Sequence, residues 1–156
     1  IKISTCKIIY TRCKRYFNMY LKINYIYVII YVVVKERRND KMSDLPTQVD
    51  EVLQKFNKGI KSILGKRIKK VILYGSYARG DYNKNSDIDI MILTDLTDDE
   101  IIKYRNQILD YAYELEWNNN FDITISPLIK NIDNFNYWVE ALPFYMNVEK
   151  EGVILN

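Results

Sequence analysis

The sequence of 156 residues contains no histidine. This absence excludes Ser-His-Asp triads, acid–base catalysis by an imidazole and metal sites that need a histidine ligand. Cysteine is almost as scarce, because Cys6 and Cys13 are the only two and both stand near the beginning of the sequence. The rest of the chain cannot form a disulfide bond within itself, as is usual in the cytosol, so we expect a cytoplasmic protein.

Basic residues are scarce after residue 41. Residues 42–156 carry thirteen Lys/Arg and eighteen Asp/Glu, a net charge of −5, whereas residues 1–41 carry ten and two, a net charge of +8. Proteins that bind nucleic acid replace its counterions with clustered cations, which the acidic part lacks. We therefore expect no stable nucleic-acid binding and no polymerase activity.

Long hydrophobic runs are missing as well. The longest, Tyr25–Val34, has ten residues, and a membrane helix needs roughly twenty. A charged segment, residues 35–38, follows this run, where a secretory signal would have small residues at its cleavage site. We expect no membrane span in this chain.

Residues 1–41 leave three interpretations open. They are an upstream stretch translated in frame before a start at Met42, a short membrane-associated leader, or an added structural element. We favour the first interpretation and expect the folded domain at residues 42–156, which is long enough for one hydrophobic core.

Hydrophobic periodicity predicts alternating helices and strands in this domain. Apolar residues at helical spacing predict a first helix that ends at Gly65. Strands are expected at residues 69–74, 87–94 and 121–126, with Pro127 closing the third. The segment between the first two strands begins as a glycine-bounded turn, which we expect to open a short helix.

Capping and breaking residues mark the later elements. Thr97 and Glu100 form a capping box that begins a helix of about twenty residues. Asp133 can cap a further helix, which Pro143 breaks or restarts. A last short strand is expected at residues 153–155.

Two carboxylates, Asp87 and Asp89, stand at the beginning of the second expected strand. Residues two apart in a strand point to the same face, so the two carboxylates project together while Ile88 and Ile90 point into a core. Adjacent carboxylates repel each other unless a cation lies between them. Magnesium suits this pair, because it is a hard ion that prefers carboxylate and phosphate oxygens.

Gly75 and Ser76 directly follow the first expected strand. Backbone N–H groups of this turn and the Ser76 hydroxyl can bind phosphate oxygens, and a helix N-terminus there would favour negative charge. Gly75 lets the backbone approach a ligand closely, because a side chain at this position would block it.

Asp122 and Arg79 are further candidates. If the third expected strand lies beside the second, the Asp122 carboxylate could bind the catalytic metal and help to deprotonate an incoming hydroxyl. Arg79 on its own would form a surface ion pair of little energetic weight. Five aromatic residues near the end of the chain are expected in the core or in a partner interface: Phe135, Tyr137, Trp138, Phe144 and Tyr145.

Together these residues resemble the signature of the DNA polymerase β nucleotidyltransferase superfamily. The signature is Gly-Ser, a spacer and Asp-x-Asp, with a third Asp later in the chain. Here ten residues separate Gly75-Ser76 from Asp87-Ile88-Asp89. The longer pattern Gly-Ser-x-Ala-Arg-Gly with Ser-Asp-Ile-Asp is complete and is similar to the minimal nucleotidyltransferase (MNT) branch, over nearly all of residues 42–156.

The resemblance implies an α/β (α+β) fold of the polymerase β type, in which a small mixed β-sheet is flanked by helices. It also implies magnesium-dependent nucleotidyl transfer from a nucleoside triphosphate, with a pair of Mg²⁺ ions. By the resemblance, the metal ligands and catalytic residues are Asp87, Asp89 and Asp122, and the triphosphate lies against Gly75, Ser76 and Arg79.

Many members of the MNT branch are antitoxins paired with a HEPN-domain ribonuclease toxin. The resemblance therefore implies transfer of AMP from ATP to a toxin tyrosine, within a complex of the two proteins. Two alternatives stay open. One is an aminoglycoside-type enzyme for small molecules, although residues 123–156 leave little room for a domain that holds the acceptor. The other is an antitoxin that acts by binding alone, which has no need to keep three acidic residues.

Overall fold

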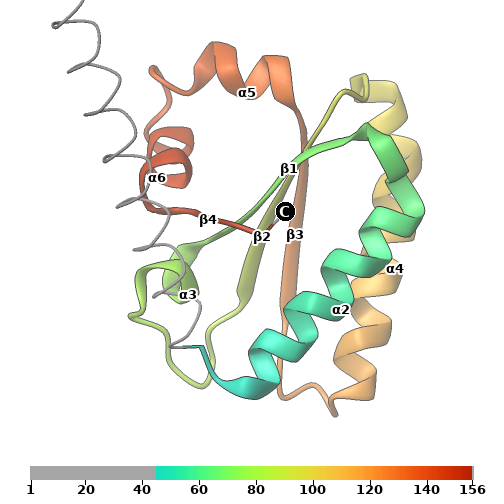
Figure 1. Ribbon diagram of the computed structural model, residues 1–156, viewed down its shortest axis with the longest axis vertical. Helices are drawn as coiled ribbons and strands as arrows, with labels where there is room; N and C mark the ends of the chain where they lie inside the picture. The colour runs from blue at the N-terminus through green and yellow to red at the C-terminus, as the bar shows by residue number, and fades with distance from the viewer. Residues whose placement is uncertain (1–44, 156) are drawn as a thin grey trace, which may run out of the picture. The chain divides into compact units, whose positions relative to one another are not determined.

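Residues 45–155 are described by the computed structural model in Figure 1. Segment 1–41 and the expected start at Met42 lie outside the described residues, so the domain boundary stays a prediction. Within residues 45–155, no helix is both long enough and apolar enough to cross a membrane.

In this part of the chain, four strands form one mixed sheet in the order β3-β2-β1-β4 (Figure 1). They are β1 (Ile68–Tyr74), β2 (Ile88–Thr94), β3 (Ile125–Asn131) and β4 (Val153–Ile154). β1 pairs antiparallel with β2 and β4, whereas β2 and β3 run parallel. The end of β1 therefore lies at the same end of the sheet as the beginnings of β2 and β3.

Helices cover both faces of the sheet. α2 (Thr47–Leu64) and α4 (Asp98–Asn118) pack on one face, and α5 (Ile132–Trp138) and α6 (Pro143–Glu151) pack on the other. The short helix α3 (Gly75–Arg79) follows β1 at the edge where that strand ends (Figure 1). The expected fold class, a small mixed sheet flanked by helices, is confirmed.

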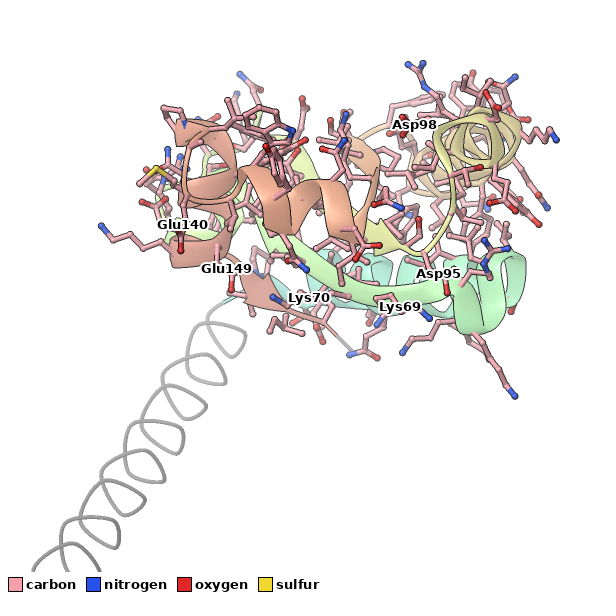
Figure 2. The ribbon with its side chains drawn as sticks, turned by 90° about the horizontal axis from the view of Figure 1, so that it is seen from above. Lys69, Lys70, Asp95, Asp98, Glu140 and Glu149 are labelled. Carbon is pink, nitrogen blue, oxygen red and sulfur yellow. The ribbon has the colours of Figure 1, made fainter. Side chains whose placement is uncertain are left out.

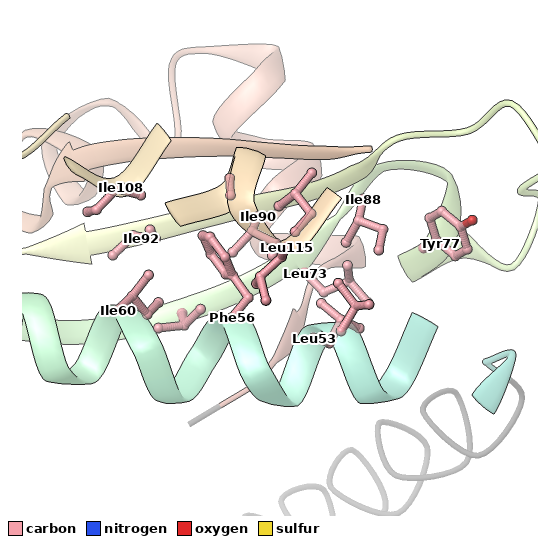
Figure 3. Close-up of a cluster of buried hydrophobic side chains, with 14 of the residues drawn as sticks. Leu53, Phe56, Ile60, Leu73, Tyr77, Ile88, Ile90, Ile92, Ile108 and Leu115 are labelled. Carbon is pink, nitrogen blue, oxygen red and sulfur yellow. The ribbon is translucent and has the colours of Figure 1, made fainter. Parts of the chain in front are cut away.

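The alternation of side chains along β2 supplies two separate cores. Ile88, Ile90 and Ile92 are fully buried against α2 and α4 (Figure 3). Met91 points the opposite way, into a second core shared with α5 and α6. Each such buried side chain stabilises the fold by about 1.5–3 kcal/mol. Asp89 stands between two of these isoleucines, so its side chain faces the α5–α6 side.

An ion pair joins the second of these helical layers to the sheet. Lys70 Nζ on β1 lies 3.2 Å from Glu149 Oε2 on α6 (Figure 2). Both side chains keep substantial contact with solvent, so the pair contributes little to stability. The buried side chains of Tyr145 and Val148 set which side of α6 faces the sheet.

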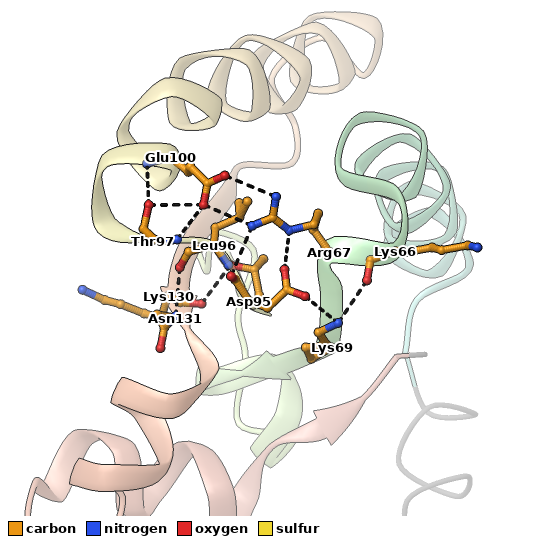
Figure 4. A network of polar contacts seen from close by, with 10 residues as sticks. Lys66, Arg67, Lys69, Asp95, Leu96, Thr97, Glu100, Lys130 and Asn131 are labelled. Atoms are coloured by element: carbon orange, nitrogen blue, oxygen red, sulfur yellow. Dashed lines mark hydrogen bonds and ion pairs between the residues drawn. The ribbon is translucent and has the colours of Figure 1, made fainter.

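At the end of the sheet remote from α3, a polar network around Arg67 joins the segments that flank β1 and β2 (Figure 4). Its guanidinium donates to Asp95 Oδ1 and, over 3.1 Å, to Glu100 Oε2. Both hydrogen bonds of the predicted capping box between Thr97 and Glu100 are present. The hydrogen bond from Arg67, together with the capping bonds, lowers the pKa of Glu100 to about 2.

The third strand differs from the prediction. β3 begins at Ile125 and runs through Pro127, because Asn120 and Phe121 adopt positive φ angles of 53° and 57° and turn the chain first. β3 is an edge strand, where the missing N–H group of a proline can face outward without breaking a pair. The expectation that Pro127 closes the strand was therefore wrong.

The helix after β3 also begins earlier than predicted. Its N-cap is Asn131 and not Asp133, since Asn131 Oδ1 accepts a hydrogen bond of 2.9 Å from the Asn134 N–H group. Asn131, the last residue of β3, thus accepts a hydrogen bond from a free N–H group of the helix, and the helix begins two residues before the predicted position. Pro143 begins α6, as the sequence predicts.

Candidate active site

Asp87 and Asp89 lie at the beginning of β2. Asp87 is exposed and immediately precedes the strand, whereas Asp89 is partly buried within it. In the antiparallel register Asp89 lies opposite Tyr74, the last residue of β1. Residues paired in this way point to the same face, so the Asp89 carboxylate and the Tyr74 ring share the α5–α6 side.

The two carboxylates are close enough to influence each other. Burial raises the pKa of Asp89 above its usual value, the negative charge of Asp87 raises it further, and the positive charge of Arg79 opposes both effects. Ionised Asp89 is therefore unfavourable beside Asp87 unless a cation lies nearby. The structure brings together the pair that the sequence predicts.

Gly75 lies directly against Asp89. Its φ angle of 72° falls in the left-handed region that other residues rarely adopt, and a Cβ atom built on it would lie 3.0 Å from the carboxyl carbon of Asp89. The same Cβ would be closer still to Asp89 Oδ2. The predicted phosphate-binding turn and the acidic pair are thus one site, in which only glycine fits at position 75.

Ser76 occupies the first turn of α3 next to Gly75 and is partly buried. Its carbonyl oxygen accepts hydrogen bonds from the N–H groups of Gly80 at 2.8 Å and Asp81 at 3.2 Å. Gly80 ends α3 with a left-handed φ of 86°. These bonds hold the backbone around Ser76 in a compact turn beside the acidic pair.

Arg79 is tied to acidic groups on both sides of this turn. Its Nε atom donates to Asp81 Oδ2 at 3.1 Å, and its Nη1 atom lies 3.9 Å from Glu151 Oε2. Arg79 also lowers the pKa of Asp89, so its positive charge reaches the site. The geometry suits the support of the turn and the attraction of an anionic ligand.

Asp122 lies apart from the pair in this structure. It is exposed, in the turn before β3, and its N–H group donates to the Asn119 carbonyl oxygen at 3.0 Å. Among residues 45–155, no three acidic or cysteine side chains form a cluster that could hold a metal ion. The parallel pairing still puts the beginning of β3 beside that of β2. The turn that carries Asp122 therefore precedes β3 at the same end of the sheet as Asp87 and Asp89.

Sequence reasoning missed Ser126. This residue pairs with Asp89 in the β2–β3 register and is exposed, so its hydroxyl shares the face of the Asp89 carboxylate. A signal was available, because polar Asp122, Thr124 and Ser126 alternate with apolar residues as a half-buried strand does. Such alternation puts Ser126 on the same face of the strand expected at residues 121–126 as Asp122, so it could have added Ser126 to the candidate residues.

Two tyrosines that sequence reasoning also missed flank the acids. Burial, and then the charge of Asp89, raise the pKa of Tyr74 to about 12. Burial likewise raises the pKa of Tyr77, with further contributions from Tyr82 and Asp87. The rings of Tyr77 and Tyr82 stack with their centroids 4.5 Å apart. No pattern in the sequence marks these tyrosines, because strand pairing and the turn bring them to the site.

An acidic pair beside a glycine turn can support a defined chemistry. Carboxylates in this arrangement can hold divalent cations, and a turn without a side chain lets phosphate groups approach them. Such sites serve phosphoryl and nucleotidyl transfer. The described residues supply both parts at one edge of the sheet.

Comparison with known proteins points the same way. The sequence model of the family described as "Nucleotidyltransferase domain" matches residues 53–154. Two proteins of Methanocaldococcus jannaschii, each named "Putative protein adenylyltransferase" (MJ0604 and MJ0141), are similar to the chain. MJ0604 is 34% identical over 106 residues, which cover 68% of this chain and 96% of that protein. MJ0141 is 39% identical over 84 residues, which cover 53% and 79%.

A solved structure was also found by comparison of folds. It is a crystal structure of a mutant of the toxin–antitoxin MntA-HpeT, with 21% sequence identity and a TM-score of 0.40. The match covers 65% of this chain and 72% of that one.

Proposed function

Since the chain belongs to the nucleotidyltransferase domain family, we propose that it transfers AMP from ATP to a tyrosine hydroxyl of a partner protein. The observation that carries this proposal is the contact of Gly75 with Asp89, beside Asp87. It joins a phosphate-binding turn to a pair of acidic residues. The names of the Methanocaldococcus relatives support a protein as the acceptor.

The transfer exchanges one bond at the α-phosphorus of ATP. The tyrosine oxygen forms a bond to this phosphorus, the bond to the oxygen that bridges to the β-phosphate breaks, and pyrophosphate leaves. The phenolic proton passes to a base, a role that we assign to Asp122. Asp122 has to approach Asp87 and Asp89 for this step, and it lies in the exposed turn that precedes β3.

The acidic pair suits magnesium by charge and by ligand type. Asp87 and Asp89 offer carboxylate oxygens. Burial, and then the charge of Asp87, raise the pKa of Asp89 despite the opposing charge of Arg79, so a further cation beside the pair would be favourable. We assign a pair of Mg²⁺ ions to these two residues, with Asp122 as the third ligand. Bound there, magnesium would activate the attacking oxygen and neutralise the leaving pyrophosphate.

The turn at α3 holds the donor in this proposal. Gly75 and Ser76 bind the triphosphate through backbone N–H groups and the serine hydroxyl, as phosphate-binding turns do. Arg79 supports the turn through Asp81 and adds positive charge close to the phosphates. The adenylyltransferase names of the relatives support ATP as the donor.

We further propose that the partner is a HEPN-domain toxin and that the chain is its antitoxin. The resemblance to the MNT branch supports this choice, and modification of a toxin tyrosine would silence the toxin. The two proteins would form a hetero-oligomer in the cytoplasm, through the domain at residues 42–156.

A competition between classes of acceptor tests the proposal. The full chain is incubated with Mg²⁺ and ATP labelled at the α-phosphate, together with the product of the adjacent gene and a panel of aminoglycosides. Label on the partner protein, with an equal amount of pyrophosphate released, supports protein adenylylation. Label on a small molecule alone would replace this function with the aminoglycoside-type reaction.

A further inference from the structure

We propose that the exposed apolar side of α5 and α6 docks the protein that accepts the nucleotide, a proposal that rests on the function proposed above. Exposed fractions of five large side chains there run from 42% to 76%. Large apolar patches in water mark interaction sites in monomeric proteins. The α5–α6 surface consists of Tyr137, Trp138, Leu142, Phe144 and Met146.

The structure divides the aromatic residues of this region into two groups. Phe135 and Tyr145 are buried in the second core, with ring centroids 5.0 Å apart. Tyr137, Trp138 and Phe144 remain exposed although they belong to the same two helices. The core is therefore filled without these three side chains, and their apolar area stays available to a partner.

This surface adjoins the candidate active site through Tyr74. The ring of Phe144 meets the ring of Tyr74 edge to face, with centroids 5.6 Å apart. Tyr74 pairs with Asp89 in the β1–β2 register, and both face the side that α5 and α6 cover. A protein bound to this surface can extend a side chain toward Asp87 and Asp89 without passing around the sheet.

Charge complementarity indicates the chemistry of the partner. From Ile132 to Glu151, the stretch that contains α5 and α6, four acidic residues stand against one basic residue, Lys150, a net charge of −3. The acidic residues are Asp133, Glu140, Glu149 and Glu151, of which Asp133 and Glu140 are exposed and make no ion pair in the described residues. Glu140 lies on the α5–α6 layer in Figure 2. The fitting partner therefore presents apolar side chains flanked by Lys or Arg, with its acceptor tyrosine nearby. Opposite charges at the rim of an interface speed association and exclude acidic competitors.

A second aromatic group on α4 provides a matched control. Tyr113 and Trp117 are 56% and 64% exposed, and both rings contact Phe121. However, α4 packs on the face of the sheet opposite to Asp89. Truncation of Tyr113 and Trp117 removes aromatic side chains of similar exposure from α4, which does not belong to the proposed docking surface.

The test measures affinity and transfer in parallel. The full chain and its variants are titrated with the product of the adjacent gene by calorimetry, and AMP on that protein is measured by mass. Melting temperatures show whether each variant is folded. The variants are Trp138→Ser with Phe144→Ser, Glu140→Lys alone, Tyr113→Ser with Trp117→Ser, and Asp87→Asn with Asp89→Asn.

We expect the Trp138/Phe144 variant to bind roughly 30-fold more weakly or worse, as loss of interface anchors does. Glu140→Lys tests the same surface without removing any packed ring and should weaken binding at least about 5-fold. The Tyr113/Trp117 variant should bind within about 3-fold of the wild type, as near-neutral positions do. The Asp87/Asp89 variant should bind normally but transfer nothing.

Several results would overturn the docking proposal. These are unchanged affinity in both α5–α6 variants, a loss of affinity in the α4 variant instead, or no complex with the wild-type chain. A wild-type dimer that the Trp138/Phe144 change dissociates would assign the surface to a second copy of this chain. Failure of the proposed function looks different, because the expected pattern of affinities would then occur without AMP on the partner.

Discussion

Gly75 and Asp89 lie in contact across the end of β1 and the beginning of β2, and a side chain at position 75 would overlap with the Asp89 carboxylate. This contact joins the turn assigned to phosphate with the carboxylate assigned to metal. It also makes the geometry of each part sensitive to the other. The first prediction follows from it.

We expect Gly75→Ala to reduce transfer of AMP to the partner by about 100-fold or more, because displacement of reacting groups by about 1 Å can cost this much. The methyl group would force the Asp89 carboxylate out of its position, and the φ of 72° would be strained for alanine. The initial rate of pyrophosphate release measures the effect.

Gly80→Ala is the control for backbone strain. Gly80 has a similar left-handed φ of 86°, but nothing lies within 4 Å of a Cβ atom built there. Both substitutions carry a strain of about 1–2 kcal/mol, so their difference isolates the overlap with Asp89. Equal losses of rate in the two variants would show that strain, and not the contact, explains the effect.

Asp89→Asn should raise the melting temperature when magnesium is absent. The pKa of Asp89 is raised in the folded state, so ionised Asp89 opposes folding, and this destabilisation grows as the pH rises above the usual value of 3.8. The asparagine removes the buried charge and its repulsion by Asp87. Calorimetric melting at neutral pH, in the presence of a chelator, measures the difference.

Magnesium should reverse this order of stability. A ligand at about 100 times its dissociation constant stabilises the folded state by about 2.7 kcal/mol, which the wild type should gain and Asp89→Asn should not. Asp110→Asn, an exposed aspartate on α4, should respond like the wild type. A wild-type melting temperature unaffected by Mg²⁺ would remove magnesium from the account.

Asp122→Asn should slow the transfer by about 100-fold, because loss of a general base typically costs at least this much. Since Asp122 is exposed in a turn, the substitution should leave the melting temperature unchanged. Single-turnover rates with the partner protein measure the effect, and Asp110→Asn serves again as the control. A normal rate would assign the base to another group.

Glu100 should make the domain sensitive to acid. Its pKa is lowered to about 2 by Arg67 and the capping bonds, so its contribution to stability is complete above the usual value of 4.5 and is lost as the pH falls through about 2. Wild type should therefore exceed Glu100→Gln in stability at pH 6, and the gap should close by pH 2. Urea unfolding across this range measures it.

Glu51→Gln is the control for the acid prediction, because Glu51 is an exposed glutamate on α2. Its stability relative to the wild type should stay nearly constant over the same range. If Glu100→Gln is still less stable than the wild type at pH 2, the contribution of Glu100 to the free energy of unfolding comes from packing and not from its charge.

Local patterns explain which features could be predicted from the sequence. Thr97 and Glu100 interact within one helical turn, and the side chains of Asp87 and Asp89 follow the period of a strand. Both features depend only on residues close in sequence, so both could be predicted. The position of Gly75 against Asp89 needed the pairing of two strands, although the Gly-Ser and Asp-x-Asp pattern pointed to it through resemblance.

The third strand shows where local patterns fail. Pro127 normally ends a strand, but β3 lies at the sheet edge and tolerates it, and only the sheet order reveals that. The left-handed turn at Asn120 and Phe121 contains no glycine, the residue from which such a turn is usually predicted. As a result the position of Asp122 was predicted within a strand, and the pairing of Ser126 with Asp89 was not predicted.

The intact mass of the partner protein after incubation with the full chain, ATP and Mg²⁺ tests the central claim most directly. The account predicts that the partner gains the mass of at least one AMP group, and that the Asp87→Asn and Asp89→Asn double variant leaves its mass unchanged. An unchanged mass with the wild-type chain, although the two proteins copurify, would contradict nucleotide transfer and favour inhibition by binding alone.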